Sequence, residues 1–262
     1  MDKNLTVLNY QDKEIILVGT AHVSKESAEL VKEVIEEHRP DSVCVELDAE
    51  RYQAIQNPKA WENTDVVKVI KTKKTGFLLA SLALGSYQKR IAKQLNVSVG
   101  GEMLQGIASA KDVGAELVLA DRNIQTTFLR IWRKLNLWEK SKLIVSLFAS
   151  GSDDEEITDD VLKKLLETDI LEAVLADMRK QFPKIGDILI SERDQYLAAK
   201  IKTAPGKKVV AVLGGAHVPG VKEEIFQERD LAEISDIPKK KPYGKIFGWT
   251  LSAAIIALIA YG

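Results

Sequence analysis

The chain has very little cysteine and histidine, and it has no excess of charge of either sign. Its one cysteine, Cys44, excludes an internal disulfide and a zinc site built from cysteines. The 37 basic and 38 acidic residues nearly cancel, so the overall charge gives no reason to expect a nucleic-acid partner. Apolar residues make up 45% of the 262 residues and charged residues 29%, which excludes a disordered or collagen-like chain. A globular fold with a substantial core is expected.

The two ends of the chain differ in hydrophobicity. The amino terminus lacks an apolar stretch long enough for a signal peptide. Residues 246–262 carry no charge, and the segment PKKKPYGK, with four lysines, precedes them. A bilayer span needs about 20 apolar residues, and flanking lysines mark the cytoplasmic side. We expect residues 1–235 to form a soluble, cytoplasmic domain, 236–245 a basic linker, and 246–262 the start of a transmembrane helix; the alternative is an apolar helix that docks on the domain.

Four nearly continuous apolar runs are typical of strands that helices cover on both faces. They lie at residues 14–18, 42–47, 116–120 and 208–213, and residues 6–10 are predicted to add an edge strand. Helical patterns separate the runs, beginning with residues 24–38. This order predicts an α/β fold with a mixed or mostly parallel central sheet flanked by helices. A helical insertion is expected between the third and fourth runs.

Further helices are predicted at residues 101–112, 123–149, 185–202 and 219–227. Glu192 falls on the apolar stripe of the third of these helices, and Arg193 lies between apolar neighbours. Charges in such positions are costly unless they are paired or used. Glu192, Arg193 and Asp194 are therefore either paired structurally or functional.

The residues that can carry chemistry follow the predicted strands. The strands lead to His22, Glu46 with Asp48, Asp121 with Arg122, and His217. Ligands of open α/β sheets bind beyond the carboxyl ends of the strands. The sequence therefore predicts a functional site at this edge, although either histidine could instead cap a helix or fill a gap in the core.

The two histidine segments match each other. LVGTAHVS and VLGGAHVP share Gly-x-Ala-His-Val after an apolar strand, which suggests two related halves that each supply one histidine. Their glycines permit a tight turn and the close approach of a ligand. Two imidazoles and the Glu46 carboxylate are a common ligand set for a catalytic divalent metal ion. The alternative for Glu46 is an ion pair with Arg51 or Arg122, and Asp48 is interpreted as a helix N-cap.

Two further features support a site. Glu102 falls in the first turn of a helix, where it either complements the helix dipole or acts as a ligand or general base. Arg122, Thr126 and Arg130 recur every four residues, so they are expected to share a helix face. Such a face either binds a carboxylate or phosphate or is simply solvated.

Six motifs in this order resemble those of the TraB/PrgY family, which is linked to the shutdown of peptide pheromone. The motifs are GTAHVSKES, VELD with Arg51 behind it, GGEM, ADRNIQTT with Arg130, SERDQYLA and GGAHVPG. The resemblance implies a soluble domain followed by several membrane helices. The chain is also similar to the Tiki proteases, metal-dependent enzymes with paired Gly-x-x-His motifs and an essential glutamate, which would correspond to His22, His217 and Glu46. Both groups belong to a superfamily with the erythromycin-esterase and ChaN-like haem-binding proteins.

The leading hypothesis is a membrane-anchored metal-dependent hydrolase, a peptidase that acts on peptides or proteins. His22, Glu46 and His217 would hold a Mn, Co or Zn ion, with Glu102 or Glu192 as the base and Arg122 or Arg193 steadying the oxyanion. The expected ligand-binding residues are Asp121, Thr126, Arg130 and Asp194. The alternative is a non-catalytic regulatory membrane protein that binds a peptide or pheromone in the same cleft. The expected partners are the substrate and a lipid bilayer but no nucleic acid, and self-association is left open.

Overall fold

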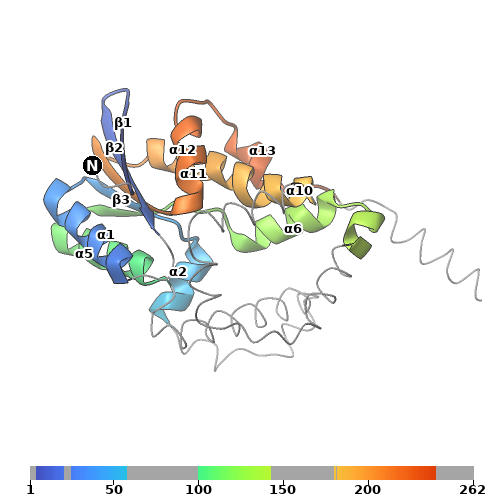
Figure 1. The fold of residues 1–262 in the computed structure, drawn as a ribbon, viewed down its shortest axis with the longest axis horizontal. Helices are drawn as coiled ribbons and strands as arrows, with labels where there is room; N and C mark the ends of the chain where they lie inside the picture. Colours follow the sequence, from blue (N-terminus) through green and yellow to red (C-terminus); the bar gives the residue numbers. More distant parts are fainter. Residues whose placement is uncertain (1–3, 21–24, 58–99, 143–179, 181, 240–262) are drawn as a thin grey trace, which may run out of the picture.

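A computed structural model describes residues 4–20, 25–57, 100–142, 180 and 182–239. Within these ranges one five-stranded sheet has the order β1-β2-β5-β3-β4 (Figure 1). The strands are β1 (Leu5–Tyr10), β2 (Lys13–Thr20), β3 (Ser42–Val45), β4 (Glu116–Leu119) and β5 (Lys208–Gly214). Only the pairing of β1 with β2 is antiparallel among the described strands. The predicted mixed, mostly parallel α/β sheet is confirmed.

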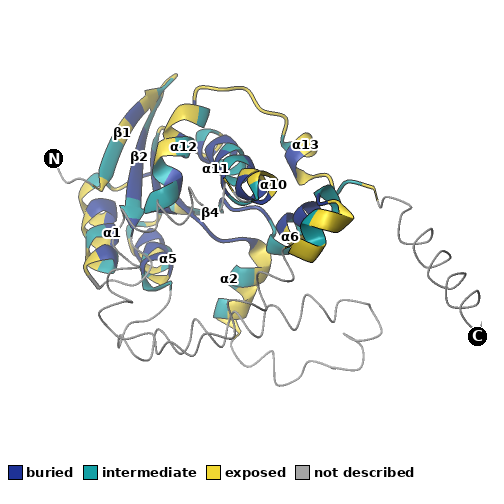
Figure 2. Cartoon of the chain, turned by 45° about the vertical axis from the view of Figure 1, so that its right-hand side comes forward, coloured by how far each residue is buried: buried dark blue, intermediate teal, exposed yellow. Residues whose placement is uncertain are grey.

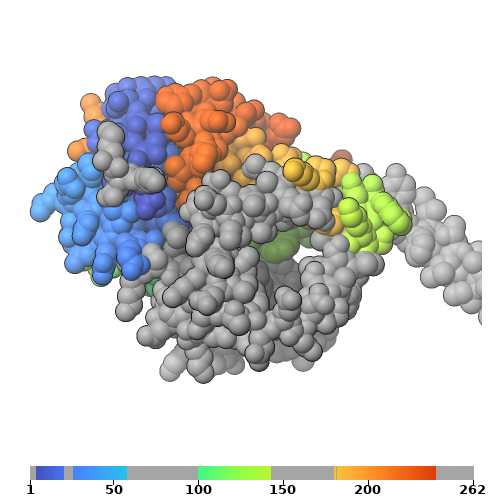
Figure 3. Space-filling view, viewed as in Figure 1, coloured from blue at the N-terminus to red at the C-terminus, as the bar shows by residue number. Residues whose placement is uncertain are grey.

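Strands from the two ends of the chain are neighbours at the centre of the sheet. β2 and β5 pair in parallel, from Glu14 opposite Lys208 to Thr20 opposite Gly214. Figure 3 shows the blue amino-terminal part and the orange carboxyl-terminal part side by side. The strands that precede the two Gly-x-Ala-His segments therefore end at the same place.

Helices cover both faces of the sheet (Figure 2). On one face, Ile16 and Val18 pack with residues of α1 (Lys25–His38) and α5 (Gly101–Val113). On the other face, Ile15 and Leu17 pack with residues of α11 (Glu192–Lys202) and α12 (Val218–Glu224). Because alternate side chains face two apolar layers, both sets must be apolar, which explains the continuous apolar runs in the sequence.

Shorter helices complete the described chain. They are α2 (Ala49–Gln56), α6 (Ile124–Lys134), α10 (Pro183–Gly186) and α13 (Leu231–Ser235). Asp48 caps α2 as predicted, because its side chain accepts hydrogen bonds from the backbone N–H groups of Glu50 and Arg51. Arg122 precedes α6, whose N-cap is Asn123, so the prediction that Arg122 shares a helix face with Thr126 and Arg130 was wrong, although Thr126 and Arg130 do lie on α6.

The predicted helix at residues 185–202 is interrupted. A π-helical segment, η1 (Asp187–Ser191), lies between α10 and α11. A π-turn takes one residue more than an α-turn, so it shifts the side chains that follow around the helix axis.

Some of the expected features lie outside the described residues. These are His22, the middle of the helical insertion at 143–179, and the apolar segment 246–262 with three of the four lysines before it. No helix among the residues that the structure describes is long and apolar enough to cross a bilayer.

Candidate functional site

His217 lies directly beyond the carboxyl end of β5. The strand ends at Gly214, a single 3₁₀ turn (Gly215–His217) follows, and α12 begins at Val218. The backbone N–H of Gly214 donates to Glu46 Oε2 at 2.8 Å, which joins this end of β5 to the residue that follows β3. Both His217 and Glu46 are largely buried. The sheet therefore brings together two of the three predicted metal ligands.

The imidazole of His217 lies between two carboxylates. Its Nδ1 is 2.6 Å from Asp194 Oδ1, and its Nε2 is 3.5 Å from Glu46 Oε1. An ionised carboxylate only accepts hydrogen bonds, so we assign the ring hydrogen to Nδ1 in the neutral form. The Nε2 lone pair then faces a carboxylate oxygen. Two such electron-rich atoms repel each other unless a cation or a proton lies between them.

Asp194 reaches His217 because Gly220 has no side chain. A Cβ atom at position 220 would overlap the carboxylate of Asp194. Gly220 lies in α12, one turn beyond His217, so the last glycine of the GGAHVPG motif makes room for the residue that orients the histidine.

Arg193 connects Glu46 to a second buried carboxylate. Its Nη2 donates to Glu46 Oε1 at 2.6 Å and to Asp121 Oδ2 at 2.6 Å, and its Nε donates to Asp121 Oδ1 at 3.1 Å. Among the described residues its Nη1 has no hydrogen-bond partner, which leaves that donor for a ligand. In the part of the chain that the structure describes, Glu46 thus forms an ion pair with Arg193 and not with Arg51 or Arg122.

Asp121 holds this arginine together with a second one. Arg51 Nη2 donates to Asp121 Oδ2 at 2.5 Å, and Arg51 Nε donates to Asp48 at 2.8 Å. Burial alone would raise the pKa of Asp121, but Arg193 and Arg51 outweigh it and hold the pKa below its usual value. Burial opposes the charge of Arg193 too, yet Asp121 and Glu46 raise its pKa, so it stays cationic.

Glu192 forms a separate buried ion cluster. Its carboxylate accepts from Arg122 Nη1 at 2.7 Å, from Nε and Nη2 of Arg130 at 2.8 Å, and from Lys134 Nζ at 2.8 Å. Burial works against the charged form, but these donors lower the pKa of Glu192 to about 2. Arg122 is almost inaccessible, and its Nε donates to the hydroxyl of Thr127. Among the described contacts, Arg122 and Arg130 thus bind Glu192, and none of the three contacts His217.

Glu102 lies at the same edge of the sheet as His217. Gly106, one turn later in α5, packs closely against Val45 and Val212, near the ends of β3 and β5. A Cβ at Gly106 would be 3.2 Å from Val45 Cγ1. Since α5 begins at Gly101, the Glu102 carboxylate sits beyond those strand ends and is buried.

The third predicted metal ligand, His22, lies outside the described residues. β2 is described up to Thr20, whose hydroxyl donates to the carbonyl of Leu213 in β5 at 3.0 Å. In the part of the chain that the structure describes, no three His, Cys, Asp or Glu residues are grouped to hold a metal ion.

Two contacts of the site were missed by the sequence reasoning. These are the pairing of Arg193 with Glu46 and that of Asp194 with His217. Arg193 and Asp194 stood out in the sequence as charges within the apolar pattern of a predicted helix. The signal for the contact of Asp194 with His217 was Gly220, three residues after His217, because a glycine within a helix indicates a close neighbour.

Comparison with known proteins agrees with this arrangement of motifs. Residues 4–230 match the TraB/PrgY/gumN family. An uncharacterized protein of Methanocaldococcus jannaschii is 31% identical over 256 residues, which cover 95% of this chain and 64% of that relative. TraB domain-containing proteins of Bos taurus and Homo sapiens are 29% and 27% identical, over 95% and 100% of this chain and 72% and 76% of their own lengths. This chain therefore spans less than two thirds of the archaeal relative, and it belongs to the TraB/PrgY/gumN family.

Proposed function

We propose that the carboxyl edge of the sheet is the active site of a metal-dependent hydrolase that cleaves peptide bonds. One observation carries the proposal: His217 is oriented by Asp194 so that its Nε2 faces Glu46 Oε1 at 3.5 Å. A carboxylate that accepts from the far nitrogen of a metal-binding histidine is the usual support for such a ligand. The membrane-anchored location expected from the carboxyl-terminal sequence is part of the same proposal.

The donors of the site fit a divalent ion. The 3.5 Å that separates Nε2 of His217 from Oε1 of Glu46 would allow both atoms to bind one ion. Glu46 and His217 would hold the ion, and His22 is the expected third ligand. An imidazole and carboxylate set suits Zn, Mn or Co. A bound ion would supply Lewis-acid polarisation of the scissile carbonyl and a bound water of lowered pKa.

The residues of the chain have separate roles in this mechanism. Asp194 holds the hydrogen on Nδ1 of His217 and keeps the ring in place. Arg193 remains cationic, and its Nη1 can donate to the oxyanion that forms as the peptide carbonyl is attacked. Glu102 is the candidate for moving the proton of the attacking water to the leaving amine. Glu192 is a weak base with a pKa of about 2, so the mechanism does not use it.

The contact between Arg193 and Glu46 favours a second candidate function. The Glu46 oxygen that faces His217 is already 2.6 Å from Nη2 of Arg193. The positive guanidinium therefore balances the negative charge that would otherwise attract a metal ion. Without a metal, Nη1 of Arg193 would offer a donor to a peptide carboxylate. The site would then bind a peptide without cleaving it, as in a regulatory membrane protein.

Melting of the purified protein with and without Mn, Co and Zn tests the proposal. An ion at about 100 times its dissociation constant stabilises the folded state by about 2.7 kcal/mol. For a domain of this size, that raises the melting temperature by about 5–10 °C. We expect this rise in the wild type and its loss in His217→Ala, Glu46→Ala and His22→Ala. His38→Ala is the matched control, because His38 ends α1 and has no contact with the site among the described residues.

The outcomes separate the two functions. Two results together support the hydrolase. The melting temperature rises with a metal ion, and the protein cleaves a peptide library at a rate that Arg193→Lys or Glu102→Gln lowers. The absence of a rise with any ion refutes the metal site and favours the peptide-binding function. A rise without cleavage leaves a metal-binding protein that is not a peptidase.

A further inference from the structure

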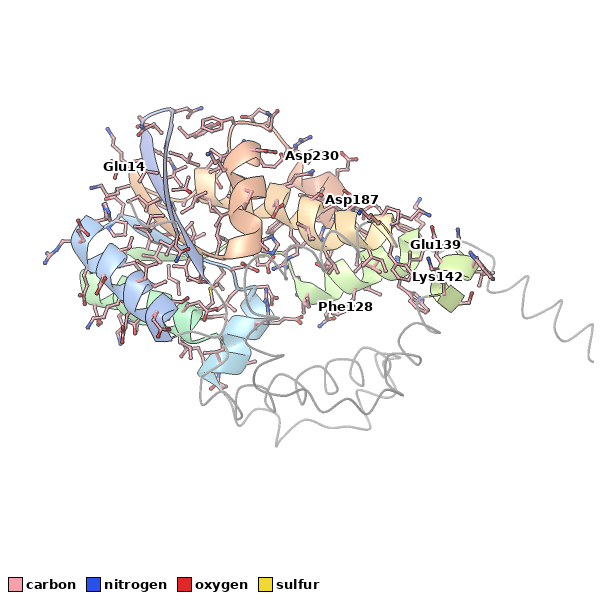
Figure 4. The ribbon with its side chains drawn as sticks, in the orientation of Figure 1. Glu14, Phe128, Glu139, Lys142, Asp187 and Asp230 are labelled. Carbon is pink, nitrogen blue, oxygen red and sulfur yellow. The ribbon has the colours of Figure 1, made fainter. Side chains whose placement is uncertain are left out.

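An exposed apolar surface lies on α6 and the helical turn that follows it. It consists of Leu129, Trp132, Leu137 and Trp138, which we call the α6 surface. Trp138 is 78% exposed, far more than a large aromatic side chain usually is. The opposite face of α6 is buried and carries Arg130 and Ile131. Figure 2 shows the yellow, exposed side of α6, and Figure 4 labels Phe128 and Lys142 close to it.

Two lysines lie in the turn that carries part of the α6 surface. The Lys140 ammonium lies 5.0 Å from the centre of the Trp132 ring. The turn after α6 therefore packs against α6 at this point. The Lys142 ammonium lies 4.9 Å from the ring centre of Phe182. The nearby acid, Glu139, is matched by Lys184 at 2.8 Å. Tryptophan, leucine and lysine together are typical of segments that rest at a membrane–water interface.

Arginines hold the last described segment, residues 231–239, against α6. Arg133 Nη1 donates to the carbonyl of Pro238 at 2.8 Å, and Arg130 Nη1 donates to the carbonyls of Glu233 and Asp236. Arg122 Nη1 donates to the carbonyl of Ile234 at 2.7 Å. The contacts of Arg122 and Arg130 lie on the buried side of α6, whereas the contact of Arg133 with Pro238 brings the chain to Lys239 beside the carboxyl-terminal end of α6. In the sequence, three more lysines follow, at positions 240, 241 and 245, and then an apolar run.

We propose that the α6 surface docks on an anionic lipid bilayer. The contact of Arg133 with Pro238 places this end of α6 where the sequence turns basic and then apolar. A membrane is the occupant that suits both the exposed aromatic surface and the sequence that follows. Anionic lipids attract juxtamembrane lysine and arginine, and the aromatic rings enter the headgroup region. The proposal does not depend on hydrolysis at His217. It sets the orientation of the domain, with α6 toward the lipid.

Thiol labelling of the full chain can test this docking. Cys44 is completely buried, so an introduced surface cysteine is the one that reacts in the folded protein. Leu137→Cys places a polarity-sensitive fluorophore on the α6 surface. Phe226→Cys is the matched control, because Leu137 and Phe226 are 56% and 55% exposed and Phe226 packs against Tyr10 of β1, away from α6. The probe is a vesicle of phosphatidylcholine and phosphatidylglycerol, with quencher-labelled acyl chains in a parallel sample.

We expect the label at 137 to shift to the blue and to be quenched by the lipid, and the label at 226 to stay unchanged. Equal responses at the two positions, or none at 137, overturn the proposal. An unchanged signal when phosphatidylglycerol is omitted overturns the assignment to an anionic surface. A blue shift at 137 that grows with protein concentration without vesicles shows a second copy of the chain as the occupant and also overturns it. Circular dichroism checks that both variants fold, and Trp138→Cys serves as a second position.

Discussion

Replacing Glu192 by glutamine tests the buried ion cluster that joins α11 to α6. The substitution keeps the shape of the side chain but removes the negative charge that balances Arg122 and Arg130. Removing one partner of a buried ion pair costs about 3–5 kcal/mol, because the remaining charge is left uncompensated. For a domain of this size, the melting temperature should fall by about 10 °C.

The pH dependence of stability gives an independent value for the same interaction. The pKa of Glu192 is lowered from 4.5 to about 2, and each pKa unit corresponds to about 1.4 kcal/mol. Because the pKa is depressed in the folded state, the stabilisation is complete above the unfolded pKa and is lost as the pH falls toward 2. The wild type should therefore lose about 3 kcal/mol from this group between about pH 5 and pH 2. Glu192→Gln should lack that part of the loss.

Urea unfolding at several pH values measures both effects. The matched control is Glu228→Gln, since the Glu228 side chain is 88% exposed and its substitution should change the free energy of unfolding by less than about 0.5 kcal/mol. The reasoning is refuted if Glu192→Gln is as stable as this control at pH 7. It is also refuted if the acid-dependent loss of stability is the same in Glu192→Gln as in the wild type.

Three further predictions concern single positions. Gly220→Ala should displace Asp194 and abolish the metal-dependent rise in melting temperature, while the metal-free protein still folds as judged by circular dichroism. Burial raises the pKa of Cys44 to about 12, so a thiol reagent should label it only after denaturant is added, as followed by mass spectrometry. Asp48→Ala removes the N-cap of α2 and should lower the free energy of unfolding by about 1 kcal/mol in urea, and no change would contradict the capping role.

The sheet could be predicted from the sequence because its strands are buried on both faces. A short, nearly continuous apolar run such as residues 14–18 has no polar side that could face water. Such a run is typical of a strand that is covered on both faces. The strand boundaries were less accurate. β3 ends at Val45 rather than Leu47, because the N–H of Leu47 turns back to the carbonyl of Val45 and the chain leaves the sheet. A turn set by one backbone hydrogen bond has no signature in apolar periodicity.

The site could be predicted only as far as the strands determine it. Parallel strands end at one edge, so the proximity of Glu46 and His217 followed from the fold class. Their partners Arg193 and Asp194 lie on α11, and Arg193 is 147 positions from Glu46 in the sequence. Its orientation depends on the π-helical segment before it, which the sequence pattern did not show. The metal ion, the substrate and the membrane anchor stay predictions.

The beginning of α11 links the ion cluster, the acidic pair and the histidine. An α-helix turns by about 100° per residue, so three consecutive side chains project toward three different neighbours. Glu192 reaches α6, Arg193 reaches the ends of β3 and β4, and Asp194 reaches His217 before α12. Any rotation of this helix end would change all three contacts at once. Since η1 sets that rotation, and a π-turn inside a helix often marks a functional site, the interruption is best understood as the feature that aims Arg193 and Asp194 at the edge of the sheet.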